Sequence, residues 1–287
     1  MSIPSRFLPP DYDMSAPVAL VAWQRLYPIL LAQRMRAAGV PVRLIAIEDE
    51  TESELVGSFP ESERVFIKMG QLGHMLKAMK KFGARYVIMA GQITPGRLFK
   101  DLHPDLKAIA ILATLKERNA DTIFGAICKE IAGMGMSLLD ARAFMDEDLA
   151  TAGVMTGGRL KAEHAHIEFG IRIAKEVSRL DIGQGVVVRK GTVLSVEAFE
   201  GTDEMLSRAN KYKTDKLIFV KTPKPRQNWC FDVPVFGLST LESMKKSGVT
   251  TACLEVDGAI MLEKAKVLAQ ARELGVEIYG YGPTTTL

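Results

Sequence analysis

The chain has 287 residues and a formal net charge of +3, with 47% hydrophobic and 25% charged residues. That length exceeds the usual size of a single core, so two domains are expected. The balanced composition is typical of a folded globular protein and excludes intrinsic disorder. The small net charge argues against nucleic-acid binding driven by bulk charge, while a local basic pocket for a phosphorylated ligand stays open.

The three cysteines, Cys128, Cys230 and Cys253, are widely spaced and form no CxxC pair. This pattern predicts reduced thiols, as in a cytoplasmic protein, rather than a disulfide framework. Residues 1–15 lack the apolar run of a secretory signal and are expected to form a flexible leader. No segment has the roughly 18 to 20 apolar residues that cross a membrane, so any membrane contact is expected to be peripheral.

Short apolar runs alternate with amphipathic helical patterns through residues 16–148. The run "VALVA" from Val18 is followed by the helical "LYPILLAQRMRAAG", which Gly39 is expected to end, and by "VRLIAI" from Val42. The same order returns in "QLGHMLKAMKKFG" with "RYVIMAG", and in "ADTIFGAICKEIAGMG" with "MSLLDA". The alternation predicts an α/β fold, with a Rossmann-like N-terminal domain whose parallel sheet is covered on both faces. Ligands of such sheets bind at the carboxyl ends of the strands.

Residues 149–162 are polar, contain glycines and have no sustained period, so they are expected to be a linker. Residues 163–287 then repeat the mixture of strands and helices and predict a second α/β domain, the C-terminal catalytic one. Within it, "VVVRKGTVLSV" places Lys190 and Gly191 between two valine-rich runs, which indicates a β-hairpin. 

Two short motifs of this second half contain candidate site residues. "DIGQG", Asp181 to Gly185, is either a plain tight turn or part of a site. In "VEAFEGTDEML", Thr202 can cap a helix, and acids in the first turn suit the helix dipole. Helix capping and the helix dipole explain Glu197 and Glu200 less well. Several carboxylates that converge where a strand ends and a helix begins are suited to bind Mg²⁺. Both interpretations stay open.

The segment "KTPKPRQNWCFDVP", Lys221 to Pro234, follows a predicted strand and therefore begins at the ligand-binding edge of a sheet. Lys221, Lys224 and Arg226 lie among prolines that restrict the backbone, so they can meet phosphate oxygens at a small ordering cost. Asp232 is the one acid in the segment. It is a candidate metal ligand or base, and the alternative is a surface salt bridge.

The sequence has no GxSxG elbow, no GxxxxGK[ST] loop and no GxGxxG after a strand. Serine-nucleophile chemistry, Walker-type NTP hydrolysis and ordinary dinucleotide binding therefore lack their main sequence support.

The stretches "QLGHMLKAMKKFGARYVIMAG", "DIGQGVVVRKGTVLSVEAFEGTDEMLSRA" and "KLIFVKTPKPRQNWCFDVPVFGLSTLESMKKSG" resemble the UDP-2,3-diacylglucosamine pyrophosphatase family of lipid A biosynthesis, the LpxI type, in the same order. The resemblance extends from about Val18 to about Gly282. It implies a Mg²⁺-dependent hydrolase that cleaves UDP-2,3-diacylglucosamine to UMP and 2,3-diacylglucosamine 1-phosphate (lipid X). It also implies a homodimer in the cytoplasm, with peripheral contact at the inner face of the inner membrane and the lipid held between two domains.

The family motifs assign expected roles to individual residues. Catalysis is expected from Asp232, Lys221 and Lys224, substrate binding from Gln184, Thr202, Asp203, Gln227, Arg97 and Gln24, and Mg²⁺ binding from Asp232, Asp203 and Glu200. In this scheme the lysines neutralise phosphate charge, while Asp232 holds the metal or orients the attacking water.

The first domain departs from the family pattern at "AWQRLYP", Ala22 to Pro28, where the family has a glycine-rich turn. Trp23 can stack on uracil there or fill the space of a phosphate. Two other functions stay open on this ground: a hydrolase of the same fold acting on another nucleotide-diphosphate sugar, and a non-catalytic nucleotide-lipid binding protein.

Overall fold

A computed structural model describes residues 5–92, 103–117, 119–212 and 215–282. The chain divides into two compact units. Unit 1 comprises Met1–Asp146 together with Asn228–Asp232, and unit 2 comprises Glu147–Gln227 together with Val233–Leu287. Each unit is built around a sheet of its own, and both are α/β, as the sequence predicts.

The sheet of unit 1 is parallel throughout, in the order β3-β2-β1-β4-β5. Its strands are β1 (Val18–Ala22), β2 (Val42–Ile47), β3 (Arg64–Ile67), β4 (Tyr86–Ala90) and β5 (Ser137–Leu138). The strand order reverses between β1 and β4, which is the point where Rossmann-like sheets bind their ligands. The predicted Rossmann-like architecture is confirmed.

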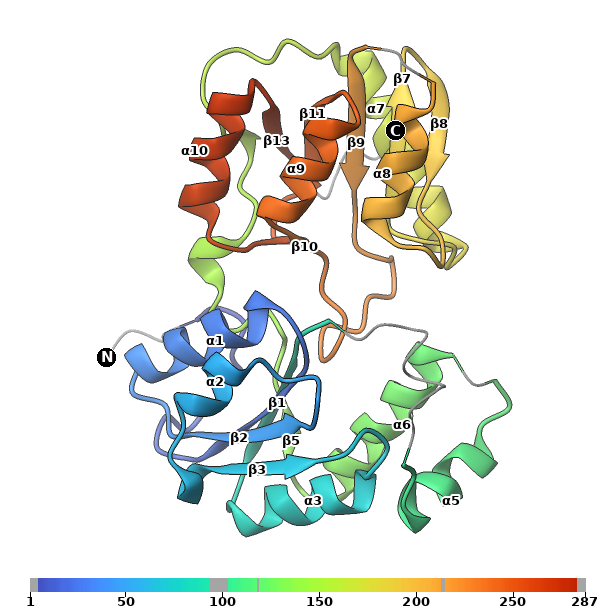
Figure 1. The fold of residues 1–287 in the computed structure, drawn as a ribbon. Coiled ribbons are helices and arrows are strands. Elements are labelled where there is room, and N and C mark those ends of the chain that lie inside the picture. The colour runs from blue at the N-terminus through green and yellow to red at the C-terminus, as the bar shows by residue number, and fades with distance from the viewer. Residues whose placement is uncertain (1–4, 93–102, 118, 213–214, 283–287) are drawn as a thin grey trace. The chain divides into compact units, whose positions relative to one another are not determined.

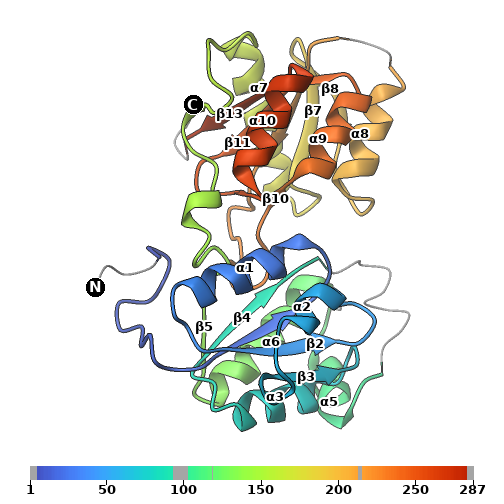
Figure 2. The same ribbon diagram turned by 60° about the vertical axis from the view of Figure 1, so that its left-hand side comes forward.

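Helices cover both faces of this sheet (Figures 1 and 2), and the central strands β1 and β4 are accordingly buried along their whole length. One face carries α1 (Leu26–Ala37) and α2 (Ser53–Gly57); the other carries α3 (Leu72–Lys81), α5 (Leu106–Thr114) and α6 (Ala120–Gly133). Alternate side chains of β1, such as Val21, pack with Met79 of α3 and Ile131 of α6 in one apolar core. 

The sheet of unit 2 is mixed, in the order β6-β13-β11-β9-β7-β8. Strands β9, β11 and β13 run parallel, while β7, β8 and β6 pair in antiparallel fashion. The strands are β6 (Gly153–Val154), β7 (Gly185–Arg189), β8 (Thr192–Val196), β9 (Leu217–Lys221), β11 (Val249–Glu255) and β13 (Glu277–Tyr281), and a separate parallel pair is formed by β10 (Val235–Phe236) and β12 (Ile260–Met261).

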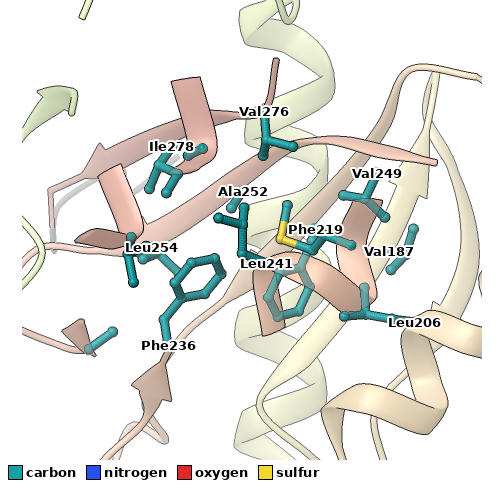
Figure 3. Close-up of a cluster of buried hydrophobic side chains, with 14 of the residues drawn as sticks. Val187, Leu206, Phe219, Phe236, Leu241, Val249, Ala252, Leu254, Val276 and Ile278 are labelled. Atoms are coloured by element: carbon teal, nitrogen blue, oxygen red, sulfur yellow. The ribbon is translucent and has the colours of Figure 1, made fainter. Parts of the chain in front are cut away.

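One helix, α7 (His164–Arg179), packs on β7 and β9, and the opposite face carries α8 (Thr202–Asn210), α9 (Leu238–Lys246) and α10 (Lys264–Leu274). The alternation of strand side chains separates the two faces: Val186 and Val188 lie toward α7, and Val187 lies in the other core. Figure 3 shows Phe219, Phe236 and Leu241 packed in that second core.

Several local predictions are confirmed. Lys190 and Gly191 form the two-residue hairpin turn between β7 and β8, with φ of 45° and 76°, as a primed turn requires. Gly39 follows α1 with φ of 79°, the left-handed conformation that ends helices. The three cysteines are free thiols. No described helix has the length and apolar character needed to span a bilayer.

Two segments differ from the sequence-based expectation. Residues 5–15, expected as a flexible leader, pack on unit 1: Leu8 is buried, and the Asp13 N–H donates to the Tyr86 hydroxyl at 2.9 Å. Residues 149–162, expected as a linker, contribute β6 to the sheet of unit 2, and Leu149 and Ala150 are fully buried. In both cases a few apolar residues within a polar stretch contact a core whose other residues are distant in sequence.

Candidate functional site

Several polar residues of the second half of the chain lie together at one edge of the unit 2 sheet, at the carboxyl ends of its parallel strands. Strands β9, β11 and β13 end there at Lys221, Glu255 and Tyr281, while β7 begins and β8 ends there, because Gly185 pairs with Lys221 and Val186 with Val196. Lys221 is 9% exposed and Glu255 is 7% exposed, although charged residues are rarely buried to this degree. This sheet edge is the candidate site.

Lys221 is held by a threonine and a glutamate. Its Nζ donates to Thr202 Oγ1 at 2.8 Å, and Thr202 Oγ1 donates to Glu197 Oε1 at 2.6 Å. The Lys221 ammonium also lies 3.9 Å from Glu197 Oε1. Thr202 begins α8, so its hydroxyl bridges a strand end and the first turn of a helix. We call these three residues the lysine relay.

The chemistry of the groups sets the direction of the two hydrogen bonds. An ammonium has only donors and an ionised carboxylate has only acceptors. The one Thr202 proton therefore goes to Glu197, and a Thr202 lone pair receives Lys221. The side chain of Lys221 is only 11% exposed, and its ammonium is thereby held in one orientation at the sheet edge.

Two glycines of the "DIGQG" motif make room for Glu197. A Cβ at Gly183 would lie 2.1 Å from the Glu197 carbonyl oxygen, and a Cβ at Gly185 would lie 2.6 Å from Glu197 Oε2. The clash at Gly183 is with backbone, so that position requires glycine, whereas at Gly185 the end of the Glu197 side chain would have to shift. The motif is therefore more than a tight turn, because it seats the glutamate of the lysine relay.

Behind Lys221 lies a buried polar network. Thr222 Oγ1 donates to Glu255 Oε2 at 2.6 Å, Lys175 of α7 also pairs with that carboxylate, and the Tyr281 hydroxyl donates to the Lys221 carbonyl oxygen at 3.2 Å. Burial, with the nearby Glu255 charge, raises the pKa of Tyr281 well above its ordinary value. The phenol therefore remains a donor at neutral pH and fixes the backbone at the end of β9.

The segment after β9 places a second lysine at the same edge. Lys224 Nζ pairs with Asp181 Oδ1 at 2.6 Å, and Gln227 Oε1 accepts from the Lys224 N–H at 2.8 Å. Gln184 lies at the same sheet edge, where its backbone carbonyl oxygen accepts from the Thr222 N–H at 3.0 Å. The structure thus gathers Gln184, Thr202, Lys221, Lys224 and Gln227, as expected for residues of one site.

The expected magnesium ligands of unit 2 have local protein partners. Glu200 pairs with Arg208, and Asp203 Oδ1 accepts from Ser243 Oγ at 2.9 Å. No group of three or more His, Cys, Asp or Glu side chains in the described parts of the chain is placed to hold a metal ion. A magnesium site made by Asp232, Asp203 and Glu200 stays a prediction, because Asp232 belongs to unit 1 and the other two residues belong to unit 2. At Glu200 and at Asp203, one carboxylate oxygen has a local protein donor.

Asp232 belongs to unit 1, with the rest of Asn228–Asp232. Phe231 stacks on Phe124 of α6 with ring centroids 5.2 Å apart, and the Trp229 carbonyl oxygen accepts from the Ala141 N–H at 2.6 Å. The Arg142 guanidinium lies 3.6 Å from the Trp229 ring centroid, as in a cation–π contact. Asp232 is therefore carried by a segment with its own anchors, separate from the lysine relay.

The turn between β1 and α1 is filled by protein. Trp23 is 6% exposed and packs edge-to-face on Phe124, so of the two interpretations of Trp23 the structure supports space filling within the core. The side-chain amide of Gln24 donates a hydrogen bond to the Glu50 carboxylate, and the Gln24 backbone forms an isolated antiparallel β-bridge with Gln92. Gly91 allows this close approach, since a Cβ there would lie 2.8 Å from the Trp23 carbonyl carbon. Arg97 lies outside the described residues.

Glu197 is the one residue of the lysine relay to which the family motifs assign no role. Its position five residues before Thr202 in "VEAFEGTD" was the available signal, because a strand end and a helix start so close in sequence bring their side chains together. The distance to Lys221 depends on pairing of β7 with both β8 and β9, which local sequence does not reveal.

Two family models match the chain: the LpxI N-terminal domain over residues 17–148 and the LpxI C-terminal domain over residues 151–279. The chain belongs to the LpxI family. A protein of Caulobacter vibrioides (strain ATCC 19089 / CIP 103742 / CB 15) named UDP-2,3-diacylglucosamine pyrophosphatase LpxI is 28% identical over 278 residues, which cover 93% of this chain and 98% of that protein. The family resemblance seen in the sequence is confirmed.

Proposed function

We propose that the protein is a hydrolase that cleaves the pyrophosphate bond of UDP-2,3-diacylglucosamine. The observation that supports this most strongly is the match of both LpxI domain models along nearly the whole chain, together with the similarity to a protein named for that activity. The name of the relative gives the substrate and the class of bond. The products, UMP and 2,3-diacylglucosamine 1-phosphate, are part of the proposal.

The lysine relay suits this chemistry. Water attacks a phosphorus surrounded by negative oxygens, and fixed positive charge lowers the cost of the extra charge in the transition state. Lys221, oriented by Thr202 and Glu197, supplies one such charge, and Lys224 supplies a second at the same sheet edge. Substrate phosphate competes with Asp181 for Lys224, since the Asp181 side chain is 55% exposed and its ion pair is weak.

We propose Asp232 as the acid that orients the attacking water, on the strength of the "FDVP" motif. Magnesium dependence is a separate proposal. Because Mg²⁺ uses only one or two protein carboxylates and otherwise contacts water and phosphate, the ion would be the one that accompanies the diphosphate, as Mg²⁺ does in many phosphoryl-transfer enzymes. 

The decisive assay incubates the purified protein with UDP-2,3-diacylglucosamine and identifies both products by mass spectrometry. Cleavage of the phosphorus–oxygen bond should release UMP, with EDTA abolishing the reaction and added Mg²⁺ restoring it. No UMP with or without Mg²⁺ would refute the function, and full activity in EDTA would refute the metal. Faster cleavage of a non-acylated UDP-sugar would favour the other hydrolase, and tight binding without turnover would favour the binding protein.

A homodimer is also proposed, on the ground of the resemblance to the LpxI family, and peripheral contact with a cytoplasmic membrane surface is proposed because the expected substrate is acylated. Light scattering of the purified protein measures the oligomeric state, and sedimentation with anionic lipid vesicles measures membrane contact. A monomer that stays in the supernatant would contradict both parts.

A further inference from the structure

The segment Asn228–Asp232 is a short excursion of the chain into unit 1, because the residues on both sides of it belong to unit 2. Its backbone forms one hydrogen-bonded turn, in which the Asn228 carbonyl oxygen accepts from the Phe231 N–H at 3.3 Å and from the Asp232 N–H at 3.1 Å. None of these five residues belongs to a helix or a strand. The conformation of the turn, and with it the position of Asp232, therefore depends on contacts with the rest of unit 1.

The Trp229 ring of this turn is held by Arg142. The Arg142 guanidinium lies 3.6 Å from the Trp229 ring centroid and 4.4 Å from the ring centroid of Phe7. Two hydrogen bonds tie the same guanidinium to Asp140, from Nε to Oδ1 at 2.9 Å and from Nη2 to Oδ2 at 2.6 Å. Such a fork uses the edge of the planar group and leaves its faces for aromatic rings. The Arg142 side chain is only 14% exposed, and cation–π contacts are stronger where water is excluded.

The backbone beside Arg142 holds the same residue. The Ala141 N–H donates to the Trp229 carbonyl oxygen at 2.6 Å, while the Ala141 carbonyl oxygen accepts from the hydroxyl of Tyr27, a buried residue of α1. Trp229 is therefore bound through its ring and through its backbone by consecutive residues of unit 1. We call Asp140, Ala141 and Arg142 the arginine clamp.

We propose that Arg142 is a positioning residue for the reaction, which through Trp229 holds the turn that carries Asp232. The proposal rests on the proposed function, in which Asp232 orients the attacking water. A misplacement of about 1 Å in such a group costs roughly 100-fold in rate. Loosening of the turn should lower kcat and leave KM unchanged, because the proposed phosphate contacts of Lys221 and Lys224 do not involve the arginine clamp.

Replacement of the guanidinium tests this role. Arg142→Lys keeps the charge but removes the planar face and the fork, so kcat should fall about 5- to 30-fold with KM unchanged. Arg36→Lys is the matched control, because the Arg36 guanidinium also lies 3.6 Å from a ring centroid, that of Phe59. It should leave kcat at the wild-type value. No loss in Arg142→Lys, or an equal loss in Arg36→Lys, would overturn the proposal.

The ring gives a second pair of variants at the half-buried Trp229. Trp229→Leu should reproduce the loss of kcat, and Trp229→Phe, which keeps an aromatic face for Arg142, should retain most of the rate. Equal rates in the two variants would contradict the role of the stack.

A double variant separates positioning from general destabilisation. In an Asp232→Ala background, Arg142→Lys should cause no further loss of kcat, because the carboxylate that the turn positions is already absent. A further loss as large as in the single variant would show that Arg142 acts on stability or on another residue, and would overturn the proposal.

Hydrogen exchange provides a readout that does not depend on activity. The N–H groups of Ala141, Phe231 and Asp232 all donate to carbonyl oxygens of the turn, so they should exchange several-fold faster in Arg142→Lys and at the wild-type rate in Arg36→Lys. Unchanged exchange in Arg142→Lys overturns the proposal even if UMP is released. Faster exchange, in a protein whose wild type releases no UMP, keeps the arginine clamp and refutes the proposed function.

Discussion

The orientation of Lys221 depends on a single hydroxyl. Thr202→Ala removes both the acceptor for the ammonium and the donor to Glu197, which leaves the charge mobile at the sheet edge. Hydrogen bonds to charged groups contribute about 1.5–3 kcal/mol, so kcat should fall roughly 10- to 100-fold.

Thr202→Ser is the matched control, because it keeps the hydroxyl at the start of α8. It should recover most of the rate in the same steady-state assay. Equal rates in the alanine and serine variants would show that Thr202 acts only as a helix residue, and unchanged rates in both would exclude the lysine relay from the reaction.

Asp232 is the second residue whose replacement is informative. Asp232→Ala should fold, retain the lipid substrate and lose turnover, because a residue that orients or activates water contributes about 10²- to 10⁴-fold. Equilibrium binding and single-turnover measurements separate the two steps. Normal turnover in this variant would refute its role, and loss of binding together with turnover would assign Asp232 to substrate affinity instead.

At the scale of elements, the approach of the "DIGQG" turn to the end of β8 depends on glycine. Gly183→Ala would place a methyl group 2.1 Å from the Glu197 carbonyl oxygen, so strand end and turn must separate. Overpacking of this kind costs about 1–3 kcal/mol, and the displaced Glu197 should also lower kcat. Thermal unfolding and steady-state kinetics measure the two effects.

Gly133→Ala is the control for that change. A Cβ at Gly133, in the last turn of α6, meets nothing within 4 Å, so the alanine should be neutral or slightly stabilising. If Gly183→Ala left both unfolding temperature and kcat at wild-type values, the packing role assigned to the motif would be wrong.

Asp105 connects two helices of unit 1, α3 and α5. It caps its own helix α5 through the Ala108 N–H at 2.9 Å, and it caps α3 through the Gly73 N–H at 2.6 Å. Burial alone would raise the pKa of Asp105, but the hydrogen bonds from Ala108, Gly73 and His74 hold it below the ordinary value. A carboxyl with a lowered folded-state pKa contributes stability above its unfolded pKa of about 3.9, and that contribution disappears as the pH falls through the folded-state pKa.

Asp105→Ala should therefore destabilise unit 1 by about 1 kcal/mol at pH 7, and the difference from wild type should shrink below about pH 4. Urea unfolding at pH 7 and pH 3 measures it. Asp105→Asn keeps a capping oxygen without the charge. Its free energy of unfolding should lie between those of the wild type and Asp105→Ala. A difference that grew on acidification would contradict the capping role.

At the scale of the whole molecule, the local pattern was sufficient to predict both α/β units. Buried parallel strands such as β1 and β4 are continuous apolar runs, and amphipathic helices follow them at regular intervals. The position of Lys221 and Lys224 at the carboxyl end of strand β9 was also predictable, since both follow a strand-like run in the sequence.

The division of that segment between two units was not predictable. The stacking of Phe231 on Phe124 joins residues that are remote in sequence, and no period or spacing encodes such a pair. The partners of the two acids were not predictable either. The spacing of Glu200 and Asp203 indicates converging carboxylates but does not reveal that Arg208 and Ser243 each contact one of their oxygens.

The discontinuity of unit 1 has a measurable consequence. Phe231 lies late in the sequence but packs on the core of unit 1, so Phe231→Ala should weaken unit 1 and leave unit 2 intact. A fully buried Phe→Ala change costs about 3–5 kcal/mol of stability, and the change at the half-buried Phe231 should cost less.

Hydrogen exchange should accelerate in α6, which carries Phe124, and stay at the wild-type rate in α7 of unit 2. Phe199→Ala, at a 79% exposed ring of unit 2, is the control and should alter neither helix. Faster exchange in α7 but not in α6 would show that residues 228–232 belong energetically to unit 2, contrary to the division described above.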